Sequence, residues 1–204
     1  MNDAPQRVVL ATRNAHKIGE LRAILADLGV VVDLVGVAEF PGVADVAETE
    51  LSFAGNALLK AVAVAEATGL PAIADDSGIC VDALNGMPGI FSARWAGRHG
   101  DDAANLDLLL AQVSDVPDEH RGAAFVCAAA LAEPGPDGRR IVEEGRINGV
   151  LLRERHGEGG FGYDPVFRPH GHDVSTAELT AEAKNRISHR RRAFAALAPH
   201  LVRG

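Results

Sequence analysis

The chain has 204 residues, a formal net charge of -8 and an isoelectric point near 5.4. This length is enough for one α/β domain with a full core, and we expect a single domain over residues 1–204. The acidic balance argues against a nucleic-acid polymer or an anionic membrane as partner, because both attract a basic surface. A small anionic ligand needs only a few local cations and is compatible with this charge.

The first residues lack the charged and then apolar pattern of a signal peptide. The longest apolar run, around residues 123–132, is too short to span a bilayer. We therefore expect a cytoplasmic protein. Cys80 and Cys127 lie far apart in apolar segments, with no Cys or His at metal-ligand spacing nearby, so we interpret them as buried thiols.

A strand, a loop and a helix are predicted at the start of the chain. Residues 7–11 are apolar and rich in β-branched side chains, and apolar residues then recur at helical spacing over 18–28 until Gly29. The start of such a helix offers unpaired N–H groups and a favourable dipole to an anion. The alternative is an ordinary helix cap beside a solvated lysine. The loop consists of Thr12, Arg13, Asn14, Ala15, His16 and Lys17.

A second strand is predicted over residues 30–35, and an acidic stretch that contains Glu48 follows it. The apolar spacing of residues 53–67 indicates a helix with one buried face. Asn56 and Lys60 are four residues apart and therefore lie on one side of this helix. The alternative for Lys60 is a solvated lysine on the helix surface, and the alternative for Glu48 is an acidic residue in a flexible loop.

Two adjacent carboxylates, Asp75 and Asp76, follow a short buried apolar run, a pattern that is typical of a strand whose end opens into a site. Strand alternation sends them to opposite sides. One can then meet a ligand or a metal while the other accepts hydrogen bonds from backbone N–H groups. The alternative is a surface turn, because Asp, Ser and Gly are ordinary turn residues.

The second half of the chain is predicted to begin with a helix over residues 102–113. Two strands, 122–132 and 139–152, then form an antiparallel hairpin, which makes the sheet mixed. In the stretch 159–167, glycines allow the backbone to approach a ligand closely and Phe161 offers a face for stacking. The alternative is a glycine-rich hairpin loop with Phe161 in the core.

Near the C-terminus, Ser175 or Thr176 together with Glu178 is predicted to open a short helix. The basic run 184–192 then precedes a last helix over 194–201. Basic residues at the start of a helix oppose its dipole, so a bound anion is one explanation for them. A solvated basic face is the alternative.

Six motifs that contain these candidate residues occur in a fixed order between residues 11 and 190. They are Thr12-x-Asn14-x-x-Lys17, Phe53-x-x-Asn56-Ala57-x-x-Lys60-Ala61, Ala74-Asp75-Asp76-Ser77-Gly78, Pro88-Gly89-Ile90-x-Ser92-Ala93-Arg94, Gly160-Phe161-Gly162-Tyr163-Asp164-Pro165 and Lys184-x-x-x-Ser188-His189-Arg190. In this order and at this spacing, the set resembles the inosine triphosphate pyrophosphatases, which remove non-standard purine nucleoside triphosphates.

The resemblance implies hydrolysis of ITP, dITP and XTP to the nucleoside monophosphate and pyrophosphate, with Mg²⁺ as cofactor. It also implies a homodimer whose protomer is one elongated α/β domain with a mixed sheet, helices on both faces and an active-site cleft between two lobes. A purine nucleotide sensor without turnover, and a magnesium phosphomonoesterase with Asp76 as nucleophile, are the alternative functions.

The resemblance also assigns roles to residues. Asp76 is expected to be the proton acceptor and a metal ligand, with Lys60 beside it in catalysis, and Glu48 is a suggested second metal ligand. Two positions depart from the family pattern, since Gly55 stands where many relatives carry Glu and Arg13 where Gly is common. Lys60 is also expected to hold the triphosphate, and Ser77 is expected to touch the substrate. The other expected contacts are Thr12, Arg13, Asn14, Ala15, His16 and Lys17 toward the triphosphate and Phe161, Gly162, Tyr163, Asp164, Lys184, His189 and Arg190 toward the base.

Overall fold

A six-stranded mixed sheet organises the chain, with the strand order β2-β1-β3-β4-β5-β6. The computed structural model describes residues 5–13 and 15–201. β1 pairs parallel to both β2 and β3, whereas β5 pairs antiparallel to β6. The predicted mixed α/β class is therefore confirmed. The strands are β1 (Gln6–Leu10), β2 (Val32–Gly36), β3 (Ala72–Val81), β4 (Gly122–Ala132), β5 (Arg140–Leu151) and β6 (Phe167–Pro169).

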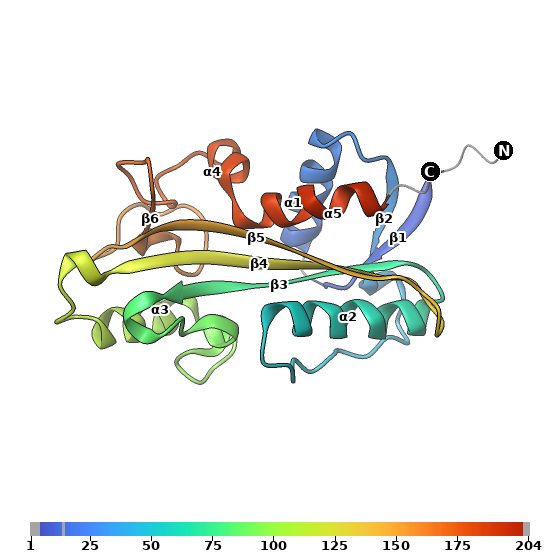
Figure 1. The fold of residues 1–204 in the computed structure, drawn as a ribbon, viewed down its shortest axis with the longest axis horizontal. Coiled ribbons are helices and arrows are strands. Elements are labelled where there is room, and N and C mark those ends of the chain that lie inside the picture. Colours follow the sequence, from blue (N-terminus) through green and yellow to red (C-terminus); the bar gives the residue numbers. More distant parts are fainter. Residues whose placement is uncertain (1–4, 14, 202–204) are drawn as a thin grey trace. The chain divides into compact units, whose positions relative to one another are not determined.

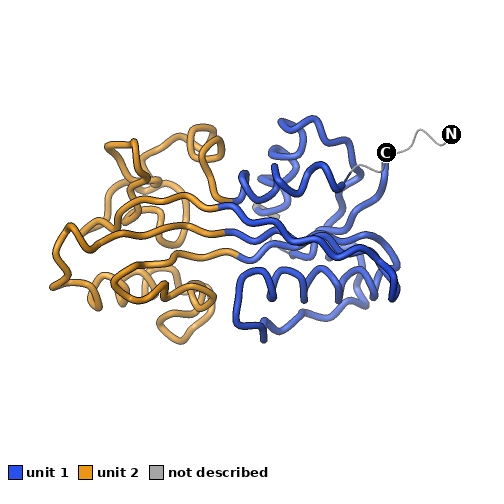
Figure 2. Tube along the Cα trace, in the orientation of Figure 1, with its two compact units in different colours: residues 1–76, 127–145, 190–204 blue, residues 77–126, 146–189 orange. Residues whose placement is uncertain are grey.

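The chain divides into two compact units, which Figure 2 shows in different colours. Unit 1 comprises the residues up to Asp76, together with Cys127–Gly145 and the chain from Arg190 onward. Unit 2 comprises Ser77–Val126 and Arg146–His189. β3, β4 and β5 each continue from one unit into the other, so each unit is built on its own part of these strands.

In unit 1, helices cover both faces of the strands (Figure 1). The helices α1 (Ala15–Asp27) and α5 (His189–Leu201) pack on one face, and α2 (Phe53–Thr68) packs on the other. Alternation along the strands separates the two cores, so that Ile73 faces α1 and α5 while Ala72 and Ala74 face α2. The predicted helices on both faces are thus present in this unit.

The helix boundaries follow from capping residues. The Ser52 side chain accepts a hydrogen bond from the Gly55 N–H at 3.0 Å, and α2 ends at Gly69, whose φ of 66° is left-handed. Asp101 caps α3 (Asp102–Gln112) in the same way through the Ala104 N–H. None of the helices in the described part of the chain combines the length and apolar character that crossing a bilayer requires.

Unit 2 has its own core, formed by α3, its parts of the strands and the segment around Tyr163 and Phe167. Leu106 and Leu109 of α3 are inserted into this core, as the helical spacing predicts. The Tyr163 hydroxyl donates to the Ser92 carbonyl oxygen at 2.8 Å. Short 3-10 turns complete the chain at Val37–Glu39, Asp82–Leu84, Gly89–Arg94, Asp118–His120 and Asp164–Val166.

The prediction of a helix that opens at Ser175 or Thr176 is wrong. α4 spans Ala181–Ile187, and its cap is Thr180, which accepts from the Ala183 N–H. The expected partner contact exists, since the Ser175 N–H donates to Glu178 at 2.8 Å. However, the Ser175 and Thr176 hydroxyls donate to carbonyl oxygens elsewhere in unit 2, so neither caps a helix.

The start of the last helix was also predicted incorrectly, because α5 already begins at His189, inside the basic run. Arg191 pairs with Asp27 of α1 at 3.0 Å. Arg190 is 3% exposed and donates to Asp75 of β3 and Glu20 of α1 at 2.8 to 3.2 Å. Carboxylates of unit 1 therefore lie beside the cationic side chains at this helix start, and a bound anion there stays a prediction.

Asp75 stays ionised inside the core because of this pairing. Burial opposes its charged form, but Lys17, Arg190 and Lys60 outweigh burial and hold the pKa of Asp75 well below its usual 3.8. Its partners are cationic side chains, not the backbone N–H groups that the sequence suggested. The two free thiols behave as expected in part, since Cys127 is fully buried but Cys80 is only partly so.

The contacts of Gly78 generate a first prediction. A Cβ atom at Gly78 would lie 2.3 Å from Ser92 Oγ and 2.5 Å from the Gly89 carbonyl oxygen. We expect Gly78→Ala to lower the free energy of unfolding by about 1–3 kcal/mol, as overpacking does. Gly19→Ala in α1 is the control: it meets nothing within 4 Å and should stabilise the helix by about 0.5–1 kcal/mol. Urea unfolding measures both, and equal midpoints would contradict the expected clash.

A second prediction concerns Asp75→Asn, which removes the carboxylate charge that two donors of the buried Arg190 guanidinium contact. We expect a loss of about 3–5 kcal/mol in the free energy of unfolding at neutral pH. Because the pKa of Asp75 is depressed, the stabilisation is complete above the usual value of 3.8 and disappears as the pH falls below it. The difference between wild type and variant should therefore shrink in acid, as urea midpoints at about pH 7, 5 and 3 would show.

Asp33→Asn is the control for this experiment, because the Asp33 pair with Arg7 is half exposed. It should change stability by no more than about 0.5 kcal/mol. A wild-type midpoint for Asp75→Asn at neutral pH would mean that the buried pair contributes no net stability.

Candidate functional site

One lysine of unit 1 lies between two carboxylates. The Lys60 ammonium is 2.8 Å from Glu48 Oε1 and 3.5 Å from Asp76 Oδ1, and all three side chains are largely buried. Asn56 Nδ2 donates to the other oxygen of Asp76 at 3.2 Å. We call these four residues the Lys60 cluster. They bring together the predicted catalytic pair and the suggested second metal ligand.

The elements place these side chains in a simple way. Asn56 and Lys60 are one helical turn apart on α2, on one side of the helix as predicted. Asp76 is on β3, and alternation directs it to the α2 face while Asp75 faces α1 and α5. Glu48 comes from an irregular segment whose Glu50 N–H donates to Asn56 Oδ1 at 2.9 Å.

The electrostatics of the cluster favour a basic carboxylate. Burial raises the pKa of Asp76, and the charges of Glu48 and Asp75 raise it further, while Lys60 and the Asn56 hydrogen bond oppose them without prevailing. Burial lowers the pKa of Lys60, but Asp76 and Glu48 overcome that effect and leave it raised. The lysine is thus firmly charged, and Asp76 is a stronger base than an ordinary aspartate.

Lys17 is held by the other member of the carboxylate pair. Its ammonium lies 3.5 Å from Asp75 Oδ2, the same oxygen that accepts from Arg190. Thr12 is partly buried in the loop that precedes α1. The expected contact of Asn14 lies outside the described residues, and so do the side chains of Ala15 and His16.

Arg13 is half exposed and turns toward the acidic segment. Its guanidinium donates to Asp45 Oδ1 at 2.9 Å and to the Val43 carbonyl oxygen. Gly55, the other departure from the family pattern, lies against Glu50, since a Cβ there would be 2.7 Å from Glu50 Cβ. The segment that carries Glu48 therefore contacts both unusual positions.

In unit 2, an exposed aromatic ring lies beside a lysine. Phe161 is 59% exposed, which rules out the alternative that it is in the core, and Lys184 Nζ is 4.8 Å from its ring centre. The buried Asp164 carboxylate accepts from the Phe161 N–H at 2.8 Å and from Thr176 Oγ1 at 2.9 Å, and it pairs with Lys184. Asp164 therefore fixes both the loop and the lysine.

The remaining predicted residues of this group have different environments. His189 stacks on Phe125 with ring centres 5.1 Å apart and planes 14° apart. Tyr163 is buried, and burial raises the pKa of its hydroxyl. The Gly162 N–H donates to Asp102 at 2.9 Å. We call Phe161, Asp164 and Lys184, which contact one another, the Phe161 cluster.

Two predicted contact residues lie elsewhere. Arg190 belongs to unit 1 and is enclosed by Asp75 and Glu20, so its direct contact with a base stays a prediction. Ser77 is partly buried on β3, directly after Asp76, and its contact with substrate is likewise a prediction. The cleft between two lobes and the elongated shape also remain predictions.

The sequence interpretation missed several partners. Asn56 was placed beside Lys60 on the helix but was not given its role of holding Asp76. Glu20 was also missed, although it lies one helical turn after Lys17 and could have been found from that spacing. Nothing in the sequence pattern indicated Asp102 or Phe125, because their contacts join distant parts of the chain.

The donors present suit a hard divalent cation that keeps most of its water. Within the described residues, no group of three or more His, Cys, Asp or Glu side chains could hold a metal. Mg²⁺ typically takes one or two protein carboxylates plus phosphate oxygens and water. Asp76 and Glu48, which already share one cationic partner, match this sparse requirement.

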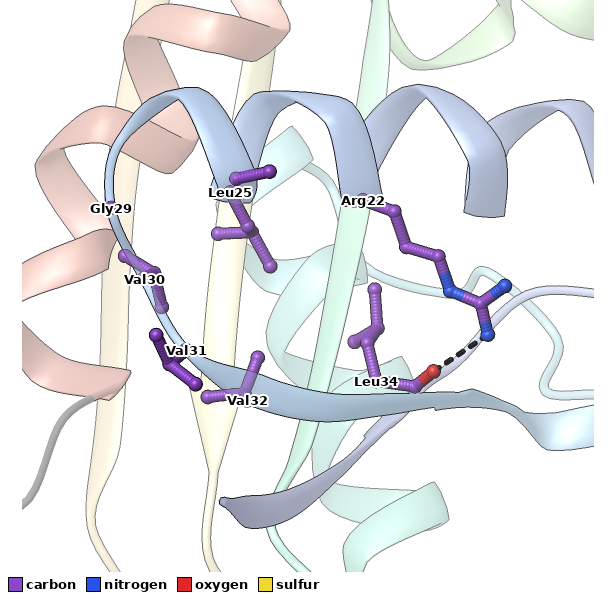
Figure 3. Close-up of a pocket in the computed structure, with 8 residues that line it drawn as sticks. Arg22, Leu25, Gly29, Val30, Val31, Val32 and Leu34 are labelled. Carbon is purple, nitrogen blue, oxygen red and sulfur yellow. Dashed lines mark hydrogen bonds between the residues drawn. The ribbon is translucent and has the colours of Figure 1, made fainter.

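A pocket of about 390 Å³ at the turn between α1 and β2 is a different kind of site (Figure 3). Leu25, Val30 and Val32 make its lining largely apolar. Its cation, Arg22, already donates to the Leu34 carbonyl oxygen at 2.8 Å. A pocket with this lining offers no grip for a triphosphate, and none of the predicted site residues lines it.

Known proteins resemble this chain over nearly its full length. A protein of Streptomyces coelicolor named dITP/XTP pyrophosphatase is 66% identical over 193 residues, covering 95% of this chain and 96% of that protein. A Nocardia farcinica protein of the same name is 57% identical over 197 residues, covering 96% and 95%.

Solved structures agree with these sequence relatives. A nucleoside-triphosphatase, dITP/XTP pyrophosphatase, from Mycobacterium abscessus has a TM-score of 0.80 at 52% identity, covering 95% of this chain and all of that one. A HAM1 protein from Coxiella burnetii has a TM-score of 0.88 at 40% identity, covering 96% and 98%. The model of the Ham1 family matches residues 8–200. The chain therefore belongs to the Ham1 family.

Proposed function

We propose that this protein hydrolyses the non-standard purine nucleoside triphosphates ITP, dITP and XTP to the monophosphate and pyrophosphate. Its removal of these nucleotides would protect the nucleotide pool. The relatives named dITP/XTP pyrophosphatase support the substrate class. The observation that carries the chemistry is the buried carboxylate Asp76 with a raised pKa beside the charged Lys60.

The phosphate end of the substrate is assigned to unit 1. A triphosphate brings about four negative charges, and phosphoryl transfer requires mainly positioning and charge stabilisation from the protein. Lys17 and Lys60 supply two cations, each held by one of two adjacent carboxylates. The loop from Thr12 to Lys17 adds backbone N–H groups at the start of α1.

We infer that Mg²⁺ is the metal, with Asp76 and Glu48 as its protein ligands. When bound, the ion would neutralise charge on the phosphate oxygens and on the leaving pyrophosphate. Lys60 now satisfies both carboxylates, so its ammonium can turn to a phosphate oxygen once another cation takes its place. Mg²⁺ would thus replace the Lys60 ammonium as the cationic partner of Asp76 and Glu48, and neither carboxylate would be left unpaired.

Asp76 is assigned as the general base. It takes a proton from a water molecule, the resulting oxygen attacks the α-phosphorus, and the bond to the β-phosphate oxygen breaks to release pyrophosphate. Burial and the charges of Glu48 and Asp75 raise the pKa of Asp76, and the ion, when bound, would oppose them. Asn56, which donates to the other carboxylate oxygen, holds the group in one orientation.

Recognition of the base is assigned to two parts of unit 2, the Phe161 cluster and His189. The exposed Phe161 ring offers a stacking surface, and Asp164 fixes its loop through the Phe161 N–H. Donors from Lys184 and His189 would be satisfied by the 6-oxo group of hypoxanthine or xanthine. The amino group of adenine would leave them unpaired, which disfavours ATP. The role assigned to Arg190 is to hold Asp75. A direct contact between Arg190 and the base is proposed as a second role.

The protein is further proposed to act as a homodimer in the cytoplasm. The absence of a basic surface bias fits a small-molecule substrate rather than nucleic acid or a membrane.

Asp76→Asn tests the assignment of the general base. We expect kcat for XTP to fall by about 10²–10⁴-fold, because the amide accepts no proton at this position. The control is Asp107→Asn, which disturbs only an exposed pair with Arg155. Near wild-type turnover of Asp76→Asn would move the base elsewhere.

Substrate choice and product identity test the activity itself. We expect kcat/KM for ITP and XTP to exceed that for ATP and GTP by at least about 10²-fold, with discrimination against ATP arising from unpaired donors. The assay incubates each triphosphate with Mg²⁺ and identifies the released phosphate species. Pyrophosphate supports the proposal, whereas orthophosphate would indicate a phosphomonoesterase. Tight binding without any product would indicate a sensor.

A further inference from the structure

The segment that brings Glu48 to Lys60 has almost no regular structure of its own. Residues 43–49 belong to neither helix nor strand. Yet Glu48 is only 24% exposed and reaches Lys60 at 2.8 Å. An irregular segment is ordered only if outside contacts offset the entropy that it loses. The contacts that hold residues 43–50 therefore decide where the Glu48 carboxylate lies.

Two side chains tie this segment at its ends. At the far end, Asn56 accepts the Glu50 N–H at 2.9 Å. At the near end, Arg13 donates to both Asp45 and the Val43 carbonyl oxygen. Val43 is 7% exposed and belongs to the α2-face core. Arg13 thus binds the segment where it leaves the core, five residues before Glu48.

The chemistry of arginine suits this task. A guanidinium is a planar fork that donates in two directions at once, here to a carboxylate and to a backbone carbonyl oxygen. A lysine ammonium at the end of a flexible side chain would hold either the carboxylate or the carbonyl oxygen less firmly. Arg13 also belongs to the loop that we assign to the phosphates, so the same side chain links this loop to the acidic segment.

We propose that Arg13 is a positioning residue, which acts by fixing residues 43–50 so that the Glu48 carboxylate stays beside Lys60 and Asp76. This inference rests on the proposed function for the metal role of Glu48. It differs from the expectation that Arg13 contacts the phosphates directly, since Nε and Nη2 of Arg13 both donate to the acidic segment.

The first measurement needs neither metal nor substrate. Hydrogen exchange of the free protein should show faster exchange for the amides of Val43 and Glu50 in Arg13→Ala, by about 2- to 10-fold, as expected for losing an exposed pair and one hydrogen bond. Arg7→Ala is the matched control, since Arg7 also pairs with two carboxylates of unit 1, Asp33 and Glu39. It should leave these two amides unchanged.

The second measurement is the Mg²⁺ concentration that gives half-maximal hydrolysis of XTP. Arg13→Ala and Asp45→Ala should each raise it by about 2- to 10-fold, with a smaller change in kcat. Arg13→Lys should give an intermediate value. Adding Arg13→Ala to Glu48→Gln should cause no further shift in the Mg²⁺ requirement, because the two residues act in series.

The possible outcomes distinguish the positioning role of Arg13 from the metal role of Glu48, on which it rests. A raised KM for XTP in Arg13→Ala, with wild-type exchange and Mg²⁺ requirement, would overturn it and show direct phosphate contact. If Glu48→Gln leaves the Mg²⁺ requirement unchanged, the metal role of Glu48 fails. Faster exchange in Arg13→Ala would then still support the positioning of residues 43–50, and wild-type exchange would overturn it.

Discussion

The site depends on one constraint, which is that two neighbouring carboxylates on a buried strand must each find a separate cationic partner. Side chains on β3 alternate between its faces, so Asp75 and Asp76 point to opposite sides and form their ion pairs with different residues. Asp75 takes Lys17 and Arg190 on the side of α1 and α5. Asp76 takes Lys60 on the side of α2. The three surrounding helices thereby receive fixed positions relative to one strand of unit 1.

The two aspartates differ because their partners differ. Lys17 and Arg190, the latter through two hydrogen bonds, keep the Asp75 carboxylate ionised although burial opposes its charge. Asp76 has to share Lys60 with Glu48, so burial prevails and its affinity for a proton rises. A single strand thus carries one carboxylate that serves the structure and one that is suited to proton transfer.

Regular elements could be predicted from the sequence because their signals are local. Apolar spacing identified α2 and β4, and the observed caps Ser52 and Asp101 are residue types that commonly begin a helix. The start of α4 was misplaced because the Ser175 hydroxyl donates to a distant carbonyl oxygen that no local pattern reveals. The enclosure of Arg190 was missed for the same reason, since its partners are 115 and 170 residues away in the chain.

The contact between Gly55 and Glu50 has an implication for how substitutions at these positions are linked. The first turn of α2 lies so close to the preceding segment that a Cβ at position 55 would be 2.7 Å from Glu50 Cβ and 3.0 Å from Glu50 Cγ. A longer residue at position 55 of this chain would therefore displace the segment that carries Glu48, unless position 50 became smaller at the same time. The side chains at positions 50 and 55 are thus a matched pair, and a change in either one reaches the acidic group beside Lys60 through two residues of backbone.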